Sequence, residues 1–153
     1  MSFLINRRGA APRAALLVLL AVCFARADVN GVKSEPDLDK RAEQAADEAD
    51  RDLDAARQAW QNGDWTRAMT DLNELEQLTE LAQTSLEETK KPPRNNRHYK
   101  DVEMKLRALL RRLDGFRLAV DYDVREDVNR IEARVQEVHD QILDAVMTKR
   151  KGK

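Results

Sequence analysis

The segment GDWTRAMTDLNEL, residues 63–75, decides how the chain divides into helices. Gly63 can adopt the left-handed conformation that ends many helices, and Asp64 can cap a helix that follows it. Beyond the cap, apolar residues recur at the helical spacing of three or four, at Ala68, Leu72 and Leu75. The segment therefore predicts a tight turn between one helix that ends near residue 61 and another that begins near residue 65.

Working outward from this turn, four segments show the same helical period, and we expect helices at about 35–61, 65–89, 97–120 and 123–147. The apolar face of the first helix is mostly alanine, whereas the other three use leucine, valine and isoleucine. Gly115 falls inside the third helix, because the apolar period continues through it. No segment shows sustained β alternation, so the sequence predicts an all-α fold.

The predicted helix starts carry capping residues. Ser34 is expected to cap the first helix, with Asp37 three residues on and Pro36 in the first turn. Asp123 with Glu126 is expected to cap the fourth helix. At roughly 1.5 Å per residue each helix is about 35–40 Å long. Near-equal lengths and short turns favour two antiparallel helical hairpins that form an up-down four-helix bundle.

The spacing of Gly63, Trp65, Ala68, Leu72 and Leu75 resembles the second half of a tetratricopeptide repeat, which implies a helix-turn-helix unit and a peptide-binding role. A second copy is expected about 34 residues later, where RHYKDVEMKLRAL (97–109) gives a partial match. Pro92–Pro93 would interrupt the first helix of that copy, so tandem repeats are not expected. The overall layout also resembles small exported bacterial helical proteins that have no assigned activity.

Residues 1–27 have the pattern of a signal peptide. Arginines precede an uncharged apolar run, 14–24, and small residues at Ala25 and Ala27 favour cleavage before Asp28. The run is shorter than the ~20 residues that span a bilayer, so no transmembrane segment is expected after cleavage. We therefore expect a periplasmic or extracellular protein; a retained anchor, a twin-arginine signal and lipidation of Cys23 are the alternatives. Residues 28–34 are expected to be a flexible mature N-terminus, and residues 149–153 a basic tail.

The charges are distributed unevenly along the chain. Residues 28–89 contain 17 acidic and 6 basic side chains, whereas residues 90–153 contain 17 basic and 11 acidic ones. One interpretation is that opposite charges help the two hairpins to pair; the other is that the basic half binds anionic envelope polymers or lipid headgroups. Nucleic acid is not expected as a partner, given the acidic half and the export signal. The candidate anion-binding residues are Lys90, Lys91, Arg94, Arg97, Lys100, Arg107, Arg111 and Arg112.

Residues for enzymatic chemistry are scarce. Cys23 is the only cysteine and lies in the predicted signal peptide, so the mature chain would have no thiol chemistry. His98 precedes Asp101 by one helical turn, which is typical of a capping or surface contact, and Asp140 is expected to point to a different helix face from His139. A haem site using His139 and Met69 is conceivable but disfavoured. We expect no catalytic residue, metal site or cofactor, and no enzyme activity.

Trp60 and Trp65 flank the turn at Gly63. They either close the end of the bundle or present an aromatic anchor to a partner, since tryptophan is enriched in interface hot spots. The sequence therefore predicts an exported, non-enzymatic interaction or scaffold protein that binds a protein partner near these two residues. An envelope-associating protein that uses its basic half is the first alternative, and a tetratricopeptide-like peptide binder is the second.

Overall fold

The computed structural model describes residues 29–148, and this part of the chain is helical, with no β-strand among the described residues. The prediction of an all-α chain is confirmed. The predicted signal peptide, with its cleavage site at Ala25, Ala27 and Asp28, and the basic tail at 149–153 lie outside the described residues. The helices are α1 (Val29–Lys33), α2 (Leu38–Gln61), α3 (Trp65–Glu88), a 3-10 turn η1 (Pro93–Asn95), α4 (Arg97–Ala119) and α5 (Arg125–Met147).

The turn between α2 and α3 has the predicted form. Gly63 has a φ of 77°, in the left-handed region that favours glycine. The carboxylate of Asp64 accepts a hydrogen bond from the backbone N–H of Arg67 at 2.9 Å, which satisfies one of the free donors at the start of α3. Gly115 lies inside α4, as the continuous apolar period predicts.

Two of the predicted caps are wrong. Asp37, rather than Ser34, caps α2, because its carboxylate accepts from the N–H groups of Asp39 at 3.0 Å and Lys40 at 3.2 Å. The Ser34 hydroxyl instead donates to the carbonyl of Asn30 at 2.9 Å. At the start of α5 the N-cap position is Val124, and no side chain caps it, so the predicted cap by Asp123 and Glu126 is absent.

Residues 28–34 were expected to be a flexible N-terminus; of these, the structure describes 29–34 and places the helix α1 at Val29–Lys33. Val29 and Val32 are one helical turn apart and both are buried, and α1 packs on α2 and α3. Burial of two valines stabilises a helix that would be too short to persist alone. This spacing of the two valines was the available sequence signal.

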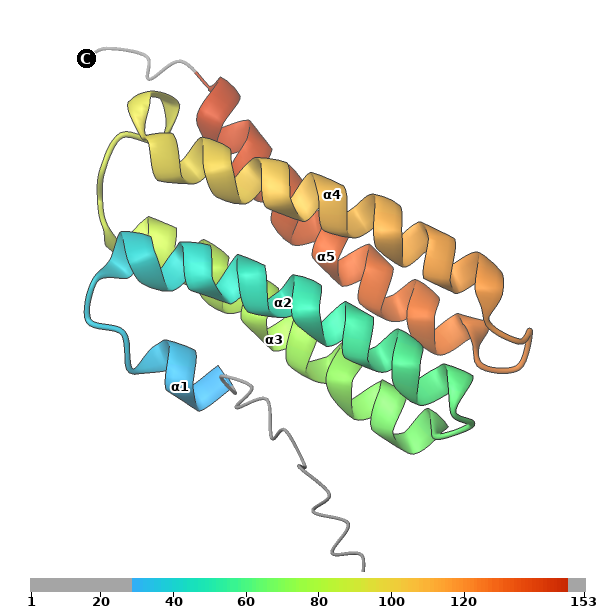
Figure 1. Ribbon diagram of the computed structural model, residues 1–153. Helices are drawn as coiled ribbons and strands as arrows, with labels where there is room; N and C mark the ends of the chain where they lie inside the picture. The colour runs from blue at the N-terminus through green and yellow to red at the C-terminus, as the bar shows by residue number, and fades with distance from the viewer. Residues whose placement is uncertain (1–28, 149–153) are drawn as a thin grey trace, which may run out of the picture.

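The four long helices form two layers, α2 with α3 and α4 with α5, which pack against each other (Figure 1). On one side α2 lies beside α4, and the ion pair between Lys105 Nζ and Asp47 Oδ1 at 2.7 Å joins them; Arg112 pairs with Asp50 and Asp54 further along. Residue numbers rise together in these pairs, so α2 and α4 run in the same direction.

The other two helices that face each other across the layers, α3 and α5, have the same arrangement. Arg130 pairs with Glu76 at 3.2 Å and Arg134 with Glu80 at 2.7 Å, so these helices also run in the same direction. The chain crosses from one layer to the other in residues 89–96. We call the end that carries residues 60–66 and 118–125 the turn end, and the end that carries residues 89–99 the crossover end (Figure 1).

Helix α2 contributes smaller side chains to the core than the other long helices. The buried apolar face of α2 consists of alanines and Leu53, whereas α4 and α5 bury leucine, valine, isoleucine and Phe116. Small side chains let α2 approach α3 closely, while the larger ones fill the space between the layers. The core reaches the turn end through Phe116, which lies under Trp60.

Candidate functional site

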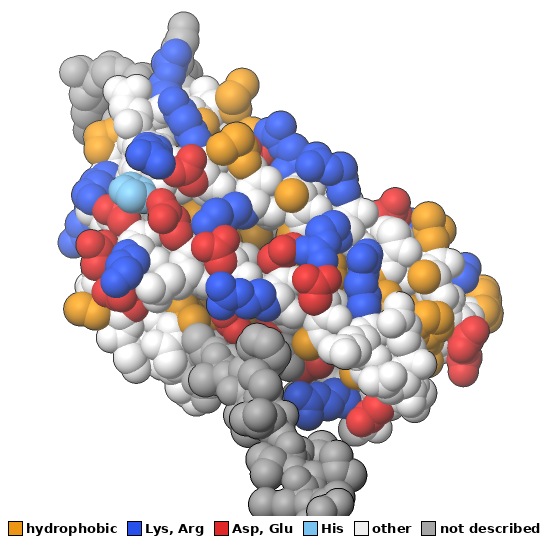
Figure 2. Space-filling model, in the orientation of Figure 1, with side chains coloured by type: hydrophobic (Ala, Val, Ile, Leu, Met, Phe, Trp, Pro, Cys, Tyr) orange, Lys and Arg blue, Asp and Glu red, His pale blue; other side chains and the backbone are white. Residues whose placement is uncertain are grey.

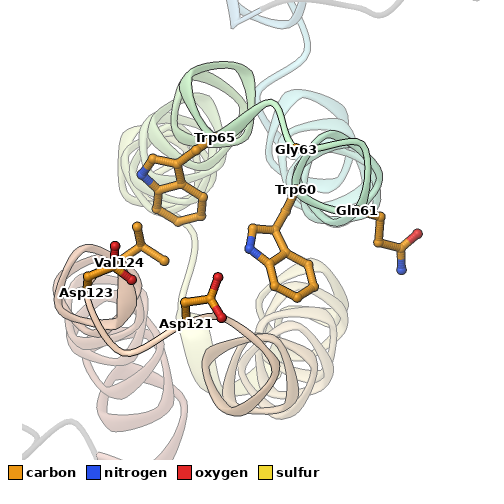
Figure 3. A pocket seen from close by; sticks show the side chains of 7 residues that line it. All are labelled: Trp60, Gln61, Gly63, Trp65, Asp121, Asp123 and Val124. Carbon is orange, nitrogen blue, oxygen red and sulfur yellow. The ribbon is translucent and has the colours of Figure 1, made fainter.

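Trp60 and Trp65 line one cavity at the turn end, with a volume of about 700 Å³. Their indole rings stand on either side of the opening, and the carboxylate of Asp121 projects between them (Figure 3). The α2–α3 turn supplies four of the lining residues and the α4–α5 turn supplies three. The lining residues are Trp60, Gln61, Gly63, Trp65, Asp121, Asp123 and Val124.

Each tryptophan is held by its own helix. Trp60 lies in the last turn of α2, where its ring meets the edge of Phe116 at 6.2 Å between centroids and an angle of 83°. This edge-to-face arrangement is favoured by the charge distribution of aromatic rings. Trp65 is the first residue of α3, and the left-handed turn at Gly63 sets it beside Trp60. Both rings are half-buried, so each presents part of its surface to the cavity.

The carboxylates of Asp121 and Asp123 are exposed and form no ion pair with any described residue. Arg125 is the nearest basic residue along the chain, but its Nη2 donates to the carbonyl of Val120 at 3.1 Å. Acidic residues between the helix layers are, by contrast, matched with arginine or lysine, as with Asp50 and Glu80. The cavity is therefore both aromatic and negatively charged.

Large apolar side chains are also exposed at the turn end. Tyr122, between the two aspartates in sequence, is 87% exposed, and Leu118 in the last turn of α4 is 61% exposed. Figure 2 shows hydrophobic side chains gathered at this end of the molecule beside acidic ones. Large side chains exposed together in this way mark interaction surfaces more often than isolated ones do.

The eight predicted anion-binding residues differ in whether they have an ion-pair partner. Four of them have carboxylate partners: Lys91 pairs with Asp39, Arg97 with Asp101 at 3.1 Å, Arg107 with Glu103 at 2.5 Å, and Arg112 with Asp50 and Asp54. The hydrogen bond that Lys91 donates to Asp39 raises the pKa of Lys91 above its ordinary value. The other four, which are exposed and have no ion pair within the described residues, are Lys90, Arg94, Lys100 and Arg111.

The histidines have carboxylate partners that differ from those expected. His98 Nδ1 lies 2.5 Å from Glu43 Oε1, while Asp101 pairs with Arg97 instead. His139 Nε2 lies 2.8 Å from Glu103 Oε1 in a buried contact, which joins α4 to α5.

The expectation that Asp140 points to a different helix face from His139 is wrong. The Nδ1 atom of His139 lies 3.1 Å from Asp140 Oδ1, so Asp140 does not point away from the histidine. Met69 lies in the first half of α3 and His139 in the second half of α5. Because these helices run in the same direction, the two residues of the conceivable haem pair lie towards different ends of the molecule.

Within residues 29–148, no group of three or more His, Cys, Asp or Glu side chains is arranged to hold a metal ion. Among the helices described for the same residues, none combines the length and apolar character needed to cross a bilayer.

No protein-family model matches the chain, and comparisons with curated proteins and with solved structures also give no match.

Sequence reasoning identified the two tryptophans but missed the carboxylates that share their cavity. Asp121 and Asp123 lie about 60 residues after Trp60 in sequence, and only the packing of the second hairpin brings them to the same end. The available signal was the stretch Asp121–Tyr122–Asp123, in which an aromatic residue lies between two acids within a turn. A stretch with two carboxylates is not expected to be buried in the core.

Proposed function

We propose that this protein is a non-enzymatic interaction protein that binds a protein partner at the turn end. The observation that carries the proposal is the single cavity lined by both tryptophans, with Tyr122 exposed beside it. Its volume of about 700 Å³ lies within the ~300–1,000 Å³ of typical binding pockets. Tryptophan and tyrosine are also the side chains most enriched among residues that dominate binding energy.

The test is capture of partners by the full chain, as its native cells produce it, and by three variants. Tyr122→Ala removes an exposed ring that the fold does not need, and Trp65→Phe keeps an aromatic ring but removes the indole. Met104→Ala is the matched control, because Met104 is 57% exposed on the side of α4, away from the cavity. We expect the first two variants to lose the partner and the control to keep it. Equal capture by all three would contradict the proposal.

Binding of an anionic envelope component through the basic half is the rival function. Lys90 and Arg94 at the crossover end favour it, because both are exposed and neither has an ion pair within residues 29–148. Against it, four of the eight candidate residues already have carboxylate partners. An electrostatic partner would be released by salt, since exposed charges are screened beyond ~8 Å at physiological ionic strength. Release by salt together with full retention by Trp65→Phe would favour the rival.

Two further parts of the proposal concern architecture and location. We infer that the four long helices form an up-down bundle of two antiparallel hairpins, supported by the two short turns at one end and the ion pairs between layers. We also propose export with removal of residues 1–27, supported by the apolar run and the small residues that follow it. N-terminal sequencing of the exported protein is expected to begin at Asp28; a protein that begins at Met1 would contradict export by cleavage.

A further inference from the structure

The chemistry of the turn-end cavity indicates what it binds. Two indole rings face the same space, and the carboxylate of Asp121 projects between them, with Asp123 on the side of Trp65 (Figure 3). An indole face carries negative partial charge and attracts a cation placed over it. The indole rings and the carboxylates therefore both favour a positively charged ligand.

Acidic residues outnumber basic ones around the cavity. Asp64, Glu126 and Asp127 are exposed near the two turns, where Arg67 and Arg125 are the basic residues. Clustered charges of one sign raise the local concentration of oppositely charged ligands and speed their association. A purely apolar partner would instead cover Asp121 and Asp123 without supplying a counter-charge, and burial of an unpaired charge is costly.

We propose that the cavity receives a lysine or arginine side chain from a basic segment of a protein partner. The cationic group lies over the indole faces of Trp60 and Trp65, and Asp121 and Asp123 accept its hydrogen bonds. The exposed side chains of Tyr122 and Leu118 contact apolar residues of the partner on either side of the cation. This inference rests on the proposed function and adds the class of side chain that the cavity recognises.

The chain provides its own reporter for this site. It contains only two tryptophans, and both line the cavity, so intrinsic tryptophan fluorescence reads this site alone. The experiment titrates the full chain with capped tripeptides, alanine–X–alanine, in which X is lysine, arginine, norleucine or glutamate, at matched ionic strength. Norleucine keeps most of the lysine chain but has no charge. We expect a saturable change with lysine and arginine, and binding of the norleucine peptide weaker by about tenfold.

Charge-removing variants test the role of the carboxylates. In the double variant Asp121→Asn/Asp123→Asn, we expect the lysine peptide to bind about tenfold more weakly than to the natural chain, because hydrogen bonds to charged groups are the stronger ones. The matched control is Glu87→Gln/Asp144→Asn, which removes the same charge from two exposed residues near the crossover end and alters no residue of the turn-end cavity. The control is expected to bind within about twofold of the natural chain, because its removed charges are exposed and screened. Equal weakening of both double variants would overturn the proposal.

The remaining outcomes separate this inference from the proposed function. If norleucine binds as well as lysine, the cavity is an apolar site and recognition of a cation is overturned. Tighter binding of free tetramethylammonium than of any peptide would overturn a protein segment as the source of the cation. If no peptide alters the fluorescence while partner capture still depends on Trp65, the cation inference fails and the proposed function stands. If capture is also independent of Trp65, the proposed function fails as well.

Discussion

The turn end and the crossover end of the molecule differ in the pairing of their carboxylates. At the crossover end, Asp39 pairs with Lys91 and Glu43 contacts His98 at 2.5 Å, while the exposed cations Lys90 and Arg94 have no ion pair among the described residues. At the turn end, Asp121 and Asp123 have no ion pair among the described residues, although they share a cavity with two tryptophans. Paired charges hold a connection in place, whereas unpaired charges beside exposed aromatic rings remain available to a partner.

The two ends also differ in the length and backbone conformation of their connections. The turn end reverses the chain with Gly63 in the left-handed region, in a tight turn that brings Trp60 and Trp65 together. The crossover end uses a longer connection with Pro92–Pro93, η1 and a lysine, Lys90, at a φ of 54°. The first arrangement positions two large side chains, and the second mainly carries the chain from one layer to the other.

The largest effect is expected from Phe116→Ala at the turn end. The variant removes a buried ring that supports Trp60 and that the Arg57 guanidinium approaches at 6.0 Å from the ring centre. Loss of a buried phenylalanine typically costs about 3–5 kcal/mol of unfolding free energy. Urea unfolding followed by tryptophan fluorescence measures it. Leu118→Ala, at a 61% exposed position, is the control and is expected to change stability by less than about 0.5 kcal/mol.

Substitution of two glycines by alanine is expected to change the free energy of unfolding by intermediate amounts of opposite sign. Gly63→Ala forces an L-residue into the left-handed region at a φ of 77° and is expected to cost about 1–2 kcal/mol. Gly115→Ala lies inside α4, where its new Cβ would meet only Arg57 Nη2 at 3.7 Å, an ordinary contact. It is expected to stabilise the protein by about 0.5–1 kcal/mol. Thermal unfolding of both variants checks the signs, and a stabilised Gly63→Ala would contradict the turn geometry.

A smaller change in the free energy of unfolding is expected at the crossover end as the pH is raised. Burial raises the pKa of Tyr99 above its ordinary value, and the charges of Glu87 and Asp39 raise it further. The unfolded chain therefore loses this proton first, so the free energy of unfolding falls as pH rises above about 10 and is unaffected at neutral pH. Urea midpoints from pH 8 to 11 should fall more for the natural chain than for Tyr99→Phe. Parallel curves would contradict this account of the crossover end.

The predictability of the fold differs from that of the site for a physical reason. Helix extents follow from local apolar spacing, and the Gly63–Asp64 turn follows from the conformations these residues favour, so both were predicted. The cap of α2 was misplaced because Ser34 and Asp37 can both accept from a free N–H, and the sequence does not show which one lies next to the first turn. Local patterns therefore locate elements well and their ends less well.

The site depends on contacts that are distant in sequence. Trp60 and Trp65 were identified because they flank one turn, but Asp121 and Asp123 join them only when α4 and α5 pack on the first hairpin. Likewise, the partners of the basic residues, such as Asp50 and Asp54 for Arg112, lie about 60 residues away. Counting charges could not show which cations would be neutralised and which carboxylates would stay unpaired.

The most direct test of the turn end as the binding surface is an NMR titration of the 15N-labelled full chain with the lysine tripeptide. The two indole N–H signals report on Trp60 and Trp65, and the backbone signals of residues 89–99 report on the crossover end. We predict that both indole signals shift in a saturable way, whereas the backbone signals of residues 89–99 do not shift. Shifts confined to residues 89–99, with the indole signals unchanged, would contradict the account.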